Sequence, residues 1–374
     1  MTKQLRAAII GTGMIGAVHA RAIRASGATL IGVLGSSPHR SAAAAGEWGV
    51  VRGYANIDDL IADHPDVVHI CTPNTTHVEY ALAVISAGIN VVVEKPLATS
   101  AHDSKRLADA AAAAGVVATV PFVYRFHPLV RELRARRIAG DFGALSLLHG
   151  AYLQDWLVAP DSSSWRVDPA AGGDSRAFGD IGSHWCDLVE FVSGETFTSV
   201  SAVTTIAYAT RPSLSGPSFT NRAQGTGRVN VTTEDTAAAT FRTATGVIAN
   251  TVISQVAAGH KNQLWFEMNG STGSAAFDQQ NPESVWLGAE DGSTVLHRGE
   301  GAVSESQARL NLVPPGHPMG YIDAFAAFVA DTYAAIGGNS PDGLPTFTDG
   351  LRSARIIESV LSSAKSNSWT DIPS

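Results

Sequence analysis

Three ionisable residues share one short, apolar stretch of this sequence. Asp180, His184 and Asp187 stand at i, i+4 and i+7, and the apolar run around them stops at Gly194. On a helix this spacing places all three side chains on one side. Buried ionisable groups are costly unless they are paired or serve a site, so the pattern favours a functional site. The alternative is an amphipathic helix whose polar side faces water.

The residue types of this stretch suit proton transfer. An imidazole titrates near neutral pH, which makes His184 a candidate general base for the proton of a hydroxyl group. Asp180, one turn earlier, would orient the imidazole and stabilise its protonated form, or would hold a substrate hydroxyl. The set has no second His, and the neighbouring Cys186 belongs to no CxxC pair, so the evidence for zinc is weak and we expect no metal.

A glycine motif near the N-terminus predicts a nucleotide-binding turn. The apolar run Leu5 to Ile10 leads into Gly11-Thr12-Gly13-Met14-Ile15-Gly16, and an Ala-rich helical stretch follows to Ala25. In a strand, GxGxxG, helix arrangement the first Gly makes the tight turn, the second admits the pyrophosphate, and the third lets helix and strand pack closely. The N–H groups at the helix N-terminus then face the phosphates. We therefore expect a dinucleotide cofactor on Gly11, Thr12, Gly13, Met14 and Ile15.

The end of the second predicted strand, Leu30 to Leu34, bears on the choice of cofactor. An NAD-specific protein places an Asp or Glu there for the ribose 2′-OH, whereas this chain has Gly35 and no carboxylate up to Arg40. Ser36, Ser37 and Arg40 offer hydroxyls and a guanidinium that can bind a phosphate. The sequence therefore favours NADP, with NAD possible. In the alternative, Ser37 merely caps the next helix and Arg40 lies on its surface.

Polar residues also follow the later strands of this first region. Strands are predicted at Val67 to Cys71, Val91 to Val93 and Val116 to Pro121, with helices between them. This alternation predicts a parallel, doubly wound sheet, in which ligands lie beyond the carboxyl ends of the strands. The residues expected at those ends to contact the cofactor are Thr72, Asn74, His77, Glu94 and Lys95. Lys95 would also place an ammonium group beside a developing alkoxide.

After Pro121 the pattern changes to successive strands. Segments such as Leu145 to Leu157 and Thr236 to Phe241 have few helices between them, which predicts a large, open, mostly antiparallel sheet. The Asp180 helix would cover one face of that sheet. We place the domains at residues 1–122 and 123–374, with the C-terminal helices as candidates to pack back on the first domain. The arginines 131, 134, 136 and 137 are expected on a solvated face, and the role of the Gly- and Ser-rich loop 211–230 stays open.

Composition excludes several classes of protein. The net charge of -8 argues against a nucleic-acid partner, and Cys71 and Cys186 form no CxxC pair that would indicate a zinc site or a disulfide framework. No run reaches the roughly 20 apolar residues that a membrane span requires. Without an apolar leader before Arg6, we expect a cytoplasmic protein. The open sheet needs a cover for its exposed face or edge, which favours a homodimer or homotetramer.

Taken in order, these motifs resemble one family of oxidoreductases. The glycine motif, Cys71-Thr72-Pro73-Asn74 with His77, Glu94-Lys95-Pro96-Leu97, and Asp180 with His184 and Asp187 are similar to the Gfo/Idh/MocA family over essentially the whole chain. The resemblance implies a Rossmann domain followed by a sheet domain used for substrate binding and oligomer formation. It also implies reversible oxidation of sugars, inositols or related polyols with a nicotinamide cofactor.

The resemblance also assigns roles to residues. Lys95, Asp180 and His184 match the family's catalytic lysine, aspartate and histidine, and Asp187 matches a residue that often contacts substrate hydroxyls. Gly35 departs from the NAD-using pattern.

Further contacts are expected from residues at the ends of predicted strands and from the loop that precedes Gly172 and Gly173. Tyr124 and Arg125 would reach nicotinamide or substrate. Gln154, Trp165 and Arg166 are candidate substrate ligands, because Trp faces stack on sugars and Arg binds hydroxyls. For each Trp, core packing is the alternative.

Two other functions share the same motifs. An enzyme that retains its cofactor can use transient oxidation to cleave a glycosidic bond without net redox. A regulator can bind NADP or a sugar on the same fold without turnover. Lys95, Asp180 and His184 together argue against the regulator, since a sensor needs no acid–base set.

Overall fold

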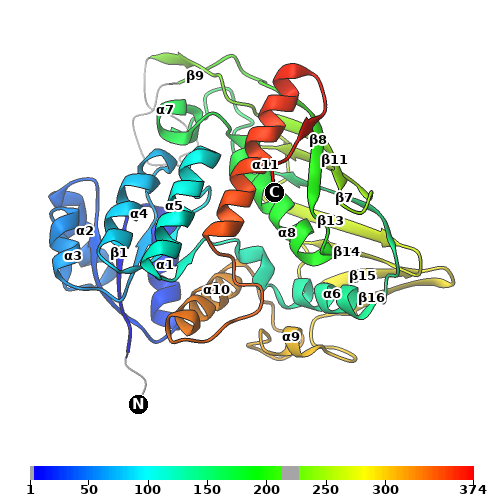
Figure 1. The fold of residues 1–374 in the computed structure, drawn as a ribbon, viewed down its shortest axis with the longest axis horizontal. Coiled ribbons are helices and arrows are strands. Elements are labelled where there is room, and N and C mark those ends of the chain that lie inside the picture. The colour runs from blue at the N-terminus through cyan, green and yellow to red at the C-terminus, as the bar shows by residue number, and fades with distance from the viewer. Residues whose placement is uncertain (1–3, 213–226) are drawn as a thin grey trace. The chain divides into compact units, whose positions relative to one another are not determined.

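The computed structural model describes residues 4–212 and 227–374, which form two compact units (Figure 1). Of the described residues, those within Met1–Val123 and Ile322–Ala354 form the first unit, and those within Tyr124–Tyr321 and Arg355–Ser374 form the second. Most of the loop whose role the sequence left open, residues 213–226, lies outside the described residues. Its two ends form the strands β9 (Thr210–Pro212) and β10 (Arg228–Asn230), which pair with each other.

The first unit is built on a parallel sheet of six strands in the order β3-β2-β1-β4-β5-β6. The strands are β1 (Arg6–Ile10), β2 (Thr29–Leu34), β3 (Arg52–Tyr54), β4 (Val67–Ile70), β5 (Asn90–Val93) and β6 (Ala118–Thr119). Strands β1, β4 and β5 are apolar and buried almost throughout, as expected for parallel strands covered on both faces. The sequence missed β3 and predicted a longer β6.

Local signals start and stop the helices of the first unit. The helices are α1 (Met14–Ala25), α2 (Pro38–Trp48), α3 (Ile57–Ala62), α4 (His77–Ser86), α5 (Ala101–Ala114) and α10 (Tyr321–Ile336), whose first residue belongs to the second unit. The side chain of Ser100 accepts a hydrogen bond from the Asp103 N–H at the start of α5, and Gly115 ends that helix in the left-handed conformation.

The second unit contains a nine-stranded sheet in the order β16-β15-β14-β13-β7-β12-β11-β8-β17. Its strands are β7 (Leu145–Leu153), β8 (Phe197–Thr205), β11 (Thr236–Thr243), β12 (Ile248–Ser254), β13 (Gln263–Gly270), β14 (Ser274–Asp278), β15 (Ser284–Ala289), β16 (Gly292–His297) and β17 (Thr370–Asp371). Every pair is antiparallel except β7 with β12. The expected fold class, a Rossmann sheet followed by a mostly antiparallel sheet, is confirmed.

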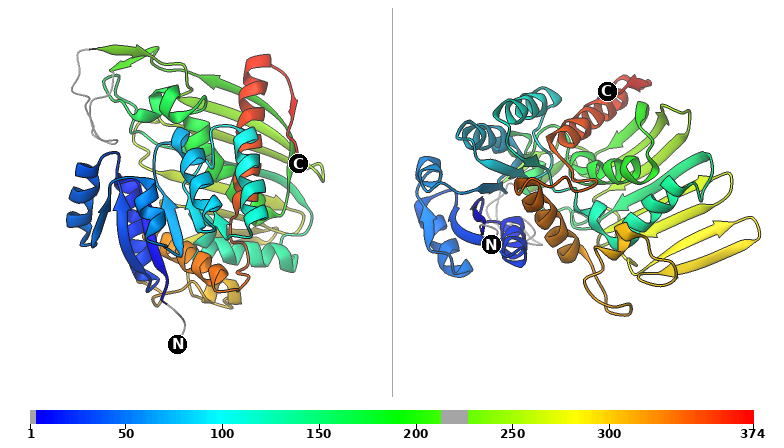
Figure 2. Two further views of the ribbon diagram at one scale, coloured as in Figure 1. Left: turned by 60° about the vertical axis from the view of Figure 1, so that its left-hand side comes forward. Right: turned by 60° about the horizontal axis from the view of Figure 1, so that its bottom comes forward.

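Helices cover one face of the nine-stranded sheet (Figure 2). They include α6 (Pro128–Ala139), α8 (Ser183–Ser193) and the later part of α11 (Phe347–Ser366). The fully buried Trp185 of α8 packs parallel to Phe197 of β8 and donates a hydrogen bond from its indole N–H to the Trp265 carbonyl oxygen, 3.1 Å away. This core fixes the helix that carries His184.

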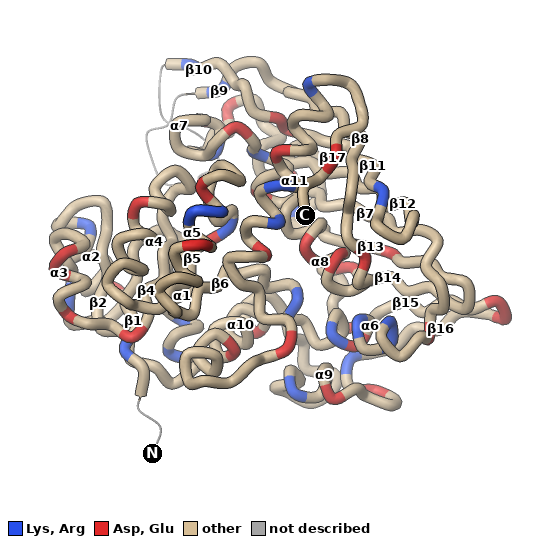
Figure 3. Tube along the Cα trace, in the orientation of Figure 1, with Lys and Arg blue, Asp and Glu red and all other residues tan. Residues whose placement is uncertain are grey.

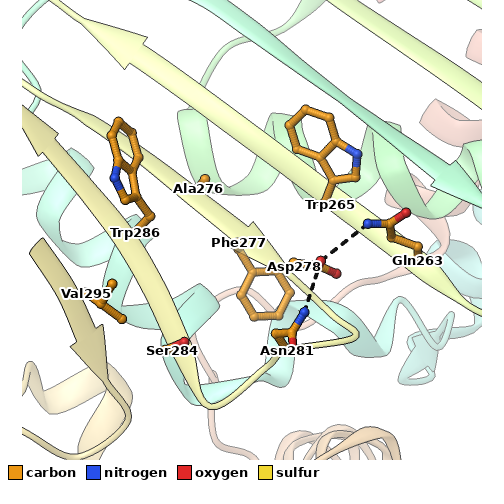
Figure 4. A pocket seen from close by; sticks show the side chains of 9 residues that line it. All are labelled: Gln263, Trp265, Ala276, Phe277, Asp278, Asn281, Ser284, Trp286 and Val295. Carbon is orange, nitrogen blue, oxygen red and sulfur yellow. Dashed lines mark hydrogen bonds between the residues drawn. The ribbon is translucent and has the colours of Figure 1, made fainter. Parts of the chain in front are cut away.

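The opposite face of the nine-stranded sheet is open in the described structure. Val203, Val252 and Val295 are exposed there. Few residues along the strands are Lys, Arg, Asp or Glu (Figure 3). A shallow hollow between Trp265 and Trp286 lies on strands β13 to β16 (Figure 4).

Two sequence expectations about this unit are wrong. Asp180 lies in η4 (Phe178–Gly182), a single π-helical turn that precedes α8, and not in the α-helix of His184. Arg131 is buried and not solvated. Its guanidinium lies 4.9 Å from the centre of the Phe191 ring and donates a hydrogen bond to the Arg125 carbonyl oxygen, so aromatic faces and a carbonyl replace water.

Candidate active site

The glycine motif forms a closely packed turn at the end of β1. Gly11 has a φ of +113°, and a Cβ there would overlap the Cys71 carbonyl oxygen, so only glycine fits. A Cβ on Gly16 would overlap the Gly11 carbonyl oxygen. In contrast, nothing among the described residues lies within 4 Å of a Cβ added to Gly13. The turn therefore has the one open glycine that a pyrophosphate group requires.

The strand register brings the other first-unit candidates to the same sheet edge. Ile10 pairs with Ile70, and Ile70 pairs with Val93, so the chain leaves β1, β4 and β5 side by side. Thr72 and Asn74 follow β4, and Glu94 and Lys95 follow β5. The Lys95 backbone N–H donates to Glu94 Oε2 at 3.0 Å.

His77 contacts the backbone of two of these turns. It is fully buried, with Nε2 3.0 Å from the Thr72 carbonyl oxygen and Nδ1 2.9 Å from the Pro96 carbonyl oxygen. Burial lowers the pKa of His77, while these carbonyl oxygens act in the opposite direction. The structure thus ties the turns after β4 and β5 together through one imidazole. Cofactor contact by His77 stays a prediction.

Three polar residues after β2 have different surroundings. The Ser37 hydroxyl accepts a hydrogen bond from the Arg40 N–H at 3.3 Å and caps α2, as in the alternative interpretation of the sequence. The side chains of Ser36 and Arg40 are exposed. A Cβ on Gly35 would lie 3.0 Å from the Ser41 backbone N, so an acidic side chain there would crowd α2.

In the second unit, Asp180 is held by two donors. The Arg166 Nε lies 3.3 Å from Asp180 Oδ1, and the buried Gln255 donates from Nε2 to Oδ2 at 2.9 Å. The Arg166 guanidinium also lies 4.5 Å from the centre of the Trp165 ring. Both oxygens of the carboxylate are therefore oriented, which suits a group that must keep one position during catalysis.

Hydrogen bonds to Glu234 fix the π-helical turn that carries Asp180. The buried Glu234 carboxylate accepts hydrogen bonds from the backbone N–H groups of Arg176 at 3.0 Å and Phe178 at 2.8 Å. Burial raises the pKa of Glu234, and these bonds partly oppose that rise.

Asp187 lies farther along α8 and forms a buried ion pair with Arg125. The Arg125 Nε donates to Asp187 Oδ2 at 2.8 Å, and Nη2 donates to Oδ1. The guanidinium also lies 4.8 Å from the centre of the Phe191 ring. Arg125 and Asp187 thus meet each other, and their expected contacts with cofactor and substrate stay predictions.

His184 is buried next to a pair of tyrosines. The Tyr124 ring meets the imidazole edge-on with centres 5.1 Å apart, and the Tyr124 hydroxyl lies 2.7 Å from the Tyr152 hydroxyl. Tyr152 donates to Asn262 Oδ1, which also accepts from Gln154 Nε2 at 2.7 Å. The structure therefore links the predicted Tyr124 and Gln154 through two residues, Tyr152 and Asn262, that the sequence did not single out.

Gln255 was missed as well. It follows β12, whose parallel pairing with β7 places the Gln154 N–H on the Ser254 carbonyl oxygen at 2.7 Å. A polar residue at the end of a predicted strand was the available signal, but the partner strand could not be inferred from sequence. In the described ranges no group of three or more His, Cys, Asp or Glu side chains is arranged to hold a metal ion. No helix within those ranges is long and apolar enough to cross a membrane.

Two family profiles match this chain. Residues 5–122 match the oxidoreductase family described by its NAD-binding Rossmann fold, and residues 130–276 match the GFO/IDH/MocA C-terminal domain. Levoglucosan dehydrogenase of Pseudarthrobacter phenanthrenivorans is 32% identical over 352 residues, which cover 90% of this chain and 88% of that protein. Inositol 2-dehydrogenase 4 of Saccharopolyspora erythraea is 33% identical over 203 residues, covering 53% of this chain and 57% of that protein.

Solved structures agree with these sequence matches. An oxidoreductase domain protein from Kribbella flavida superimposes with a TM-score of 0.90 at 31% identity, over 100% of both chains. Levoglucosan dehydrogenase in complex with NADH and levoglucosan superimposes with a TM-score of 0.89 at 28% identity, over 99% of this chain and 100% of that one. The chain belongs to the Gfo/Idh/MocA family of oxidoreductases, and the expected enzyme class, a nicotinamide-dependent dehydrogenase or reductase, is confirmed.

Proposed function

We propose that this enzyme transfers hydride reversibly between NADP and a secondary hydroxyl or ketone of a sugar, an inositol or a related polyol. The observation that carries the proposal is Asp180, fixed by Arg166 and Gln255 on the turn that leads into the helix of His184. An oriented carboxylate followed one turn later by a buried imidazole suits acid–base chemistry on a hydroxyl group.

Oxidation requires that a proton and a hydride leave the same carbinol. His184 takes the hydroxyl proton, and Asp180 orients the substrate or stabilises the imidazolium that forms. The Lys95 ammonium stabilises the negative charge that develops on the substrate oxygen. The bound nicotinamide ring supplies the hydride acceptor. The products are a ketone, the reduced cofactor and one proton, and reduction follows the same steps in reverse.

The first unit supports a dinucleotide at the sheet edge. The open space at Gly13 and the packed turn at Gly11 and Gly16 fit a pyrophosphate, and Thr72, Asn74, Glu94 and Lys95 follow the neighbouring strands. We assign the contacts with the remainder of the cofactor to Thr12, Met14, Ile15, His77 and Arg125.

The choice of NADP rests on the exposed Ser36 and Arg40 and on the absence of a carboxylate from residues 35–40. NADH complexes of levoglucosan dehydrogenase make NAD the alternative. Arg40→Ala is expected to weaken NADP+ binding about tenfold, because it removes one charge-assisted hydrogen bond to the phosphate. Binding of NAD+ should stay unchanged. Equal effects on both cofactors, measured by calorimetry, would overturn the assignment.

For the substrate we assign Tyr124, Gln154, Trp165, Arg166 and Asp187 to sugar contacts, beside the catalytic residues. The Trp165 ring suits the C–H face of a sugar, although its other face receives the Arg166 guanidinium. The relative that acts on levoglucosan makes an anhydrosugar the first substrate to test.

We also propose that the enzyme is a cytoplasmic homodimer or homotetramer. Val203, Val252 and Val295 are exposed apolar side chains on the open sheet face, and burial of such side chains between subunits would be favourable. Light scattering of the purified protein would measure its mass in solution, and a monomer at all concentrations would contradict this assignment.

Incubation of the protein with NADP+ or NAD+ and a panel of monosaccharides, inositols and anhydrosugars tests the function. The expected result is formation of reduced nicotinamide, faster with NADP+. Tightly bound cofactor that cycles without net reduction would instead indicate the transient-oxidation enzyme, and binding without any turnover would indicate a regulator.

A further inference from the structure

A buried chain of four hydrogen-bonding side chains runs through the first unit. His19 of α1 is fully buried, and its Nε2 lies 3.1 Å from Glu94 Oε1. The His19 Nδ1 lies 2.7 Å from Nδ1 of the fully buried His69 on β4. His69 Nε2 lies 2.9 Å from the hydroxyl of Tyr333 on α10. None of His19, His69 and Tyr333 has a part in the chemistry proposed above.

Donor and acceptor counting gives this chain a definite direction when Glu94 is ionised. A carboxylate only accepts, so His19 must donate from Nε2, and a neutral His19 then accepts at Nδ1. His69 therefore donates from Nδ1 and accepts at Nε2 from the Tyr333 hydroxyl. Every group is satisfied with both imidazoles neutral.

The electrostatic environment agrees with a neutral His69 imidazole in this series of hydrogen bonds. Burial, and then the neighbouring His19, lower the pKa of His69 well below its usual value. Burial raises the pKa of Tyr333, which keeps its hydroxyl protonated as a donor. This series of hydrogen bonds thus provides Glu94 with one N–H donor, His19 Nε2, in a fixed position.

Glu94 connects this chain to the residue that we assign to catalysis. While Oε1 accepts from His19, Oε2 accepts from the Lys95 backbone N–H at 3.0 Å. The carboxylate therefore bridges a buried, directed donor and the peptide group from which the Lys95 side chain extends. On the other side of the turn, His77 holds the Pro96 carbonyl oxygen at 2.9 Å.

We propose that His19 is a positioning residue for Lys95, acting through Glu94 and backed by His69 and Tyr333. The role rests on the proposed function, since it gives Lys95 a defined position only for the reaction assigned to it. Simple core filling does not account for the arrangement, because an apolar side chain would fill the same space without a partner for the buried Glu94. A misplacement of about 1 Å at a catalytic group costs on the order of 100-fold in rate.

The proton positions can be observed without turnover. In protein labelled with ¹⁵N-histidine, long-range proton–nitrogen correlation distinguishes the two neutral tautomers. The expected result is a proton on His19 Nε2 and, for His69, a proton on Nδ1 and none on Nε2. A His19 protonated only on Nδ1 would overturn the proposal, because it could not donate to Glu94.

A matched pair of variants tests the positioning role. His19→Gln can place an amide N–H near the former Nε2 and keep the donor to Glu94, whereas His19→Asn can reach only the position of Nδ1. We expect kcat to fall at least about tenfold in His19→Asn and less than about threefold in His19→Gln, with cofactor binding within about twofold in both. Equal kcat values for both variants, at similar unfolding midpoints, would overturn the proposal.

A second readout separates this proposal from the proposed function. An amine-reactive ester labels Lys95 at a rate that depends on its surroundings, and the exposed Lys105 serves as the internal reference. We expect the ratio of Lys95 to Lys105 labelling to change in His19→Asn and to stay as in the wild type in His19→Gln. Absence of turnover in the wild type would refute the proposed function, and the labelling ratio would then decide the positioning role alone: an unchanged ratio in His19→Asn refutes it.

Discussion

Substitution of Gly13 by Ala separates cofactor binding from folding. The backbone of Gly13, with φ -79° and ψ -176°, is open to any residue, and a Cβ there has nothing within 4 Å among the described residues. The free energy of unfolding should change by less than about 1 kcal/mol. If the pyrophosphate passes over Gly13, the added methyl group displaces it and removes one hydrogen bond to a charged group, about 1.5–3 kcal/mol. Cofactor binding should then weaken roughly 10- to 150-fold.

Gly16→Ala is the matched control for Gly13→Ala. Its Cβ would overlap the Gly11 carbonyl oxygen and come within 3.2 Å of the Trp48 ring, so the backbone must shift. Overpacking of this kind costs about 1–3 kcal/mol of stability. Calorimetry with NADP+ and NAD+ and thermal unfolding measure both effects. Cofactor binding by Gly13→Ala as tight as in the wild type would refute the placement of the phosphates.

Two further predictions concern the second unit. Gln255→Leu removes the donor to Asp180 Oδ2, and we expect kcat to fall about tenfold; a wild-type kcat would contradict the orienting role. Burial lowers the pKa of His127 to about 4, so the unfolded chain binds a proton below about pH 6.5 that the folded chain does not. The contribution of the neutral His127 to the free energy of unfolding is therefore fully present above about pH 6.5 and is lost as the pH falls toward 4. His127→Asn, which keeps an acceptor for the Leu129 N–H, should reduce this acid-induced loss by up to ~3 kcal/mol, measured by urea unfolding at several pH values.

Local patterns predicted much of the first unit. The glycine motif, the alternation of strands and helices and the polar residues after each strand are all short-range signals, and the parallel register then brings Thr72 and Glu94 to one edge. The contact between His19 and Glu94 joins residues 75 positions apart. Neither helical periodicity nor motif spacing contains information about such a pair.

The site in the second unit was harder to predict from the sequence, because it depends on contacts between residues far apart in the chain. A helical spacing of four placed Asp180 and His184 on one side, but the chain makes a π-helical turn at Asp180. The buried Glu234 anchors that turn from a distant part of the sequence. Likewise, the sequence predicts Arg131 as a surface residue, because its contact with the aromatic ring of Phe191 cannot be inferred from the sequence.

The most direct test of the central claim is the rate of cofactor reduction by His184→Ala and Lys95→Ala, measured on the best substrate of the panel. The account predicts that His184→Ala binds cofactor as the wild type does, and that at saturating cofactor both variants lose at least about 100-fold in kcat. It also predicts that a deuterium on the oxidised carbon appears in the reduced nicotinamide. A wild-type kcat in either variant, or a reduced cofactor without the deuterium, would contradict it.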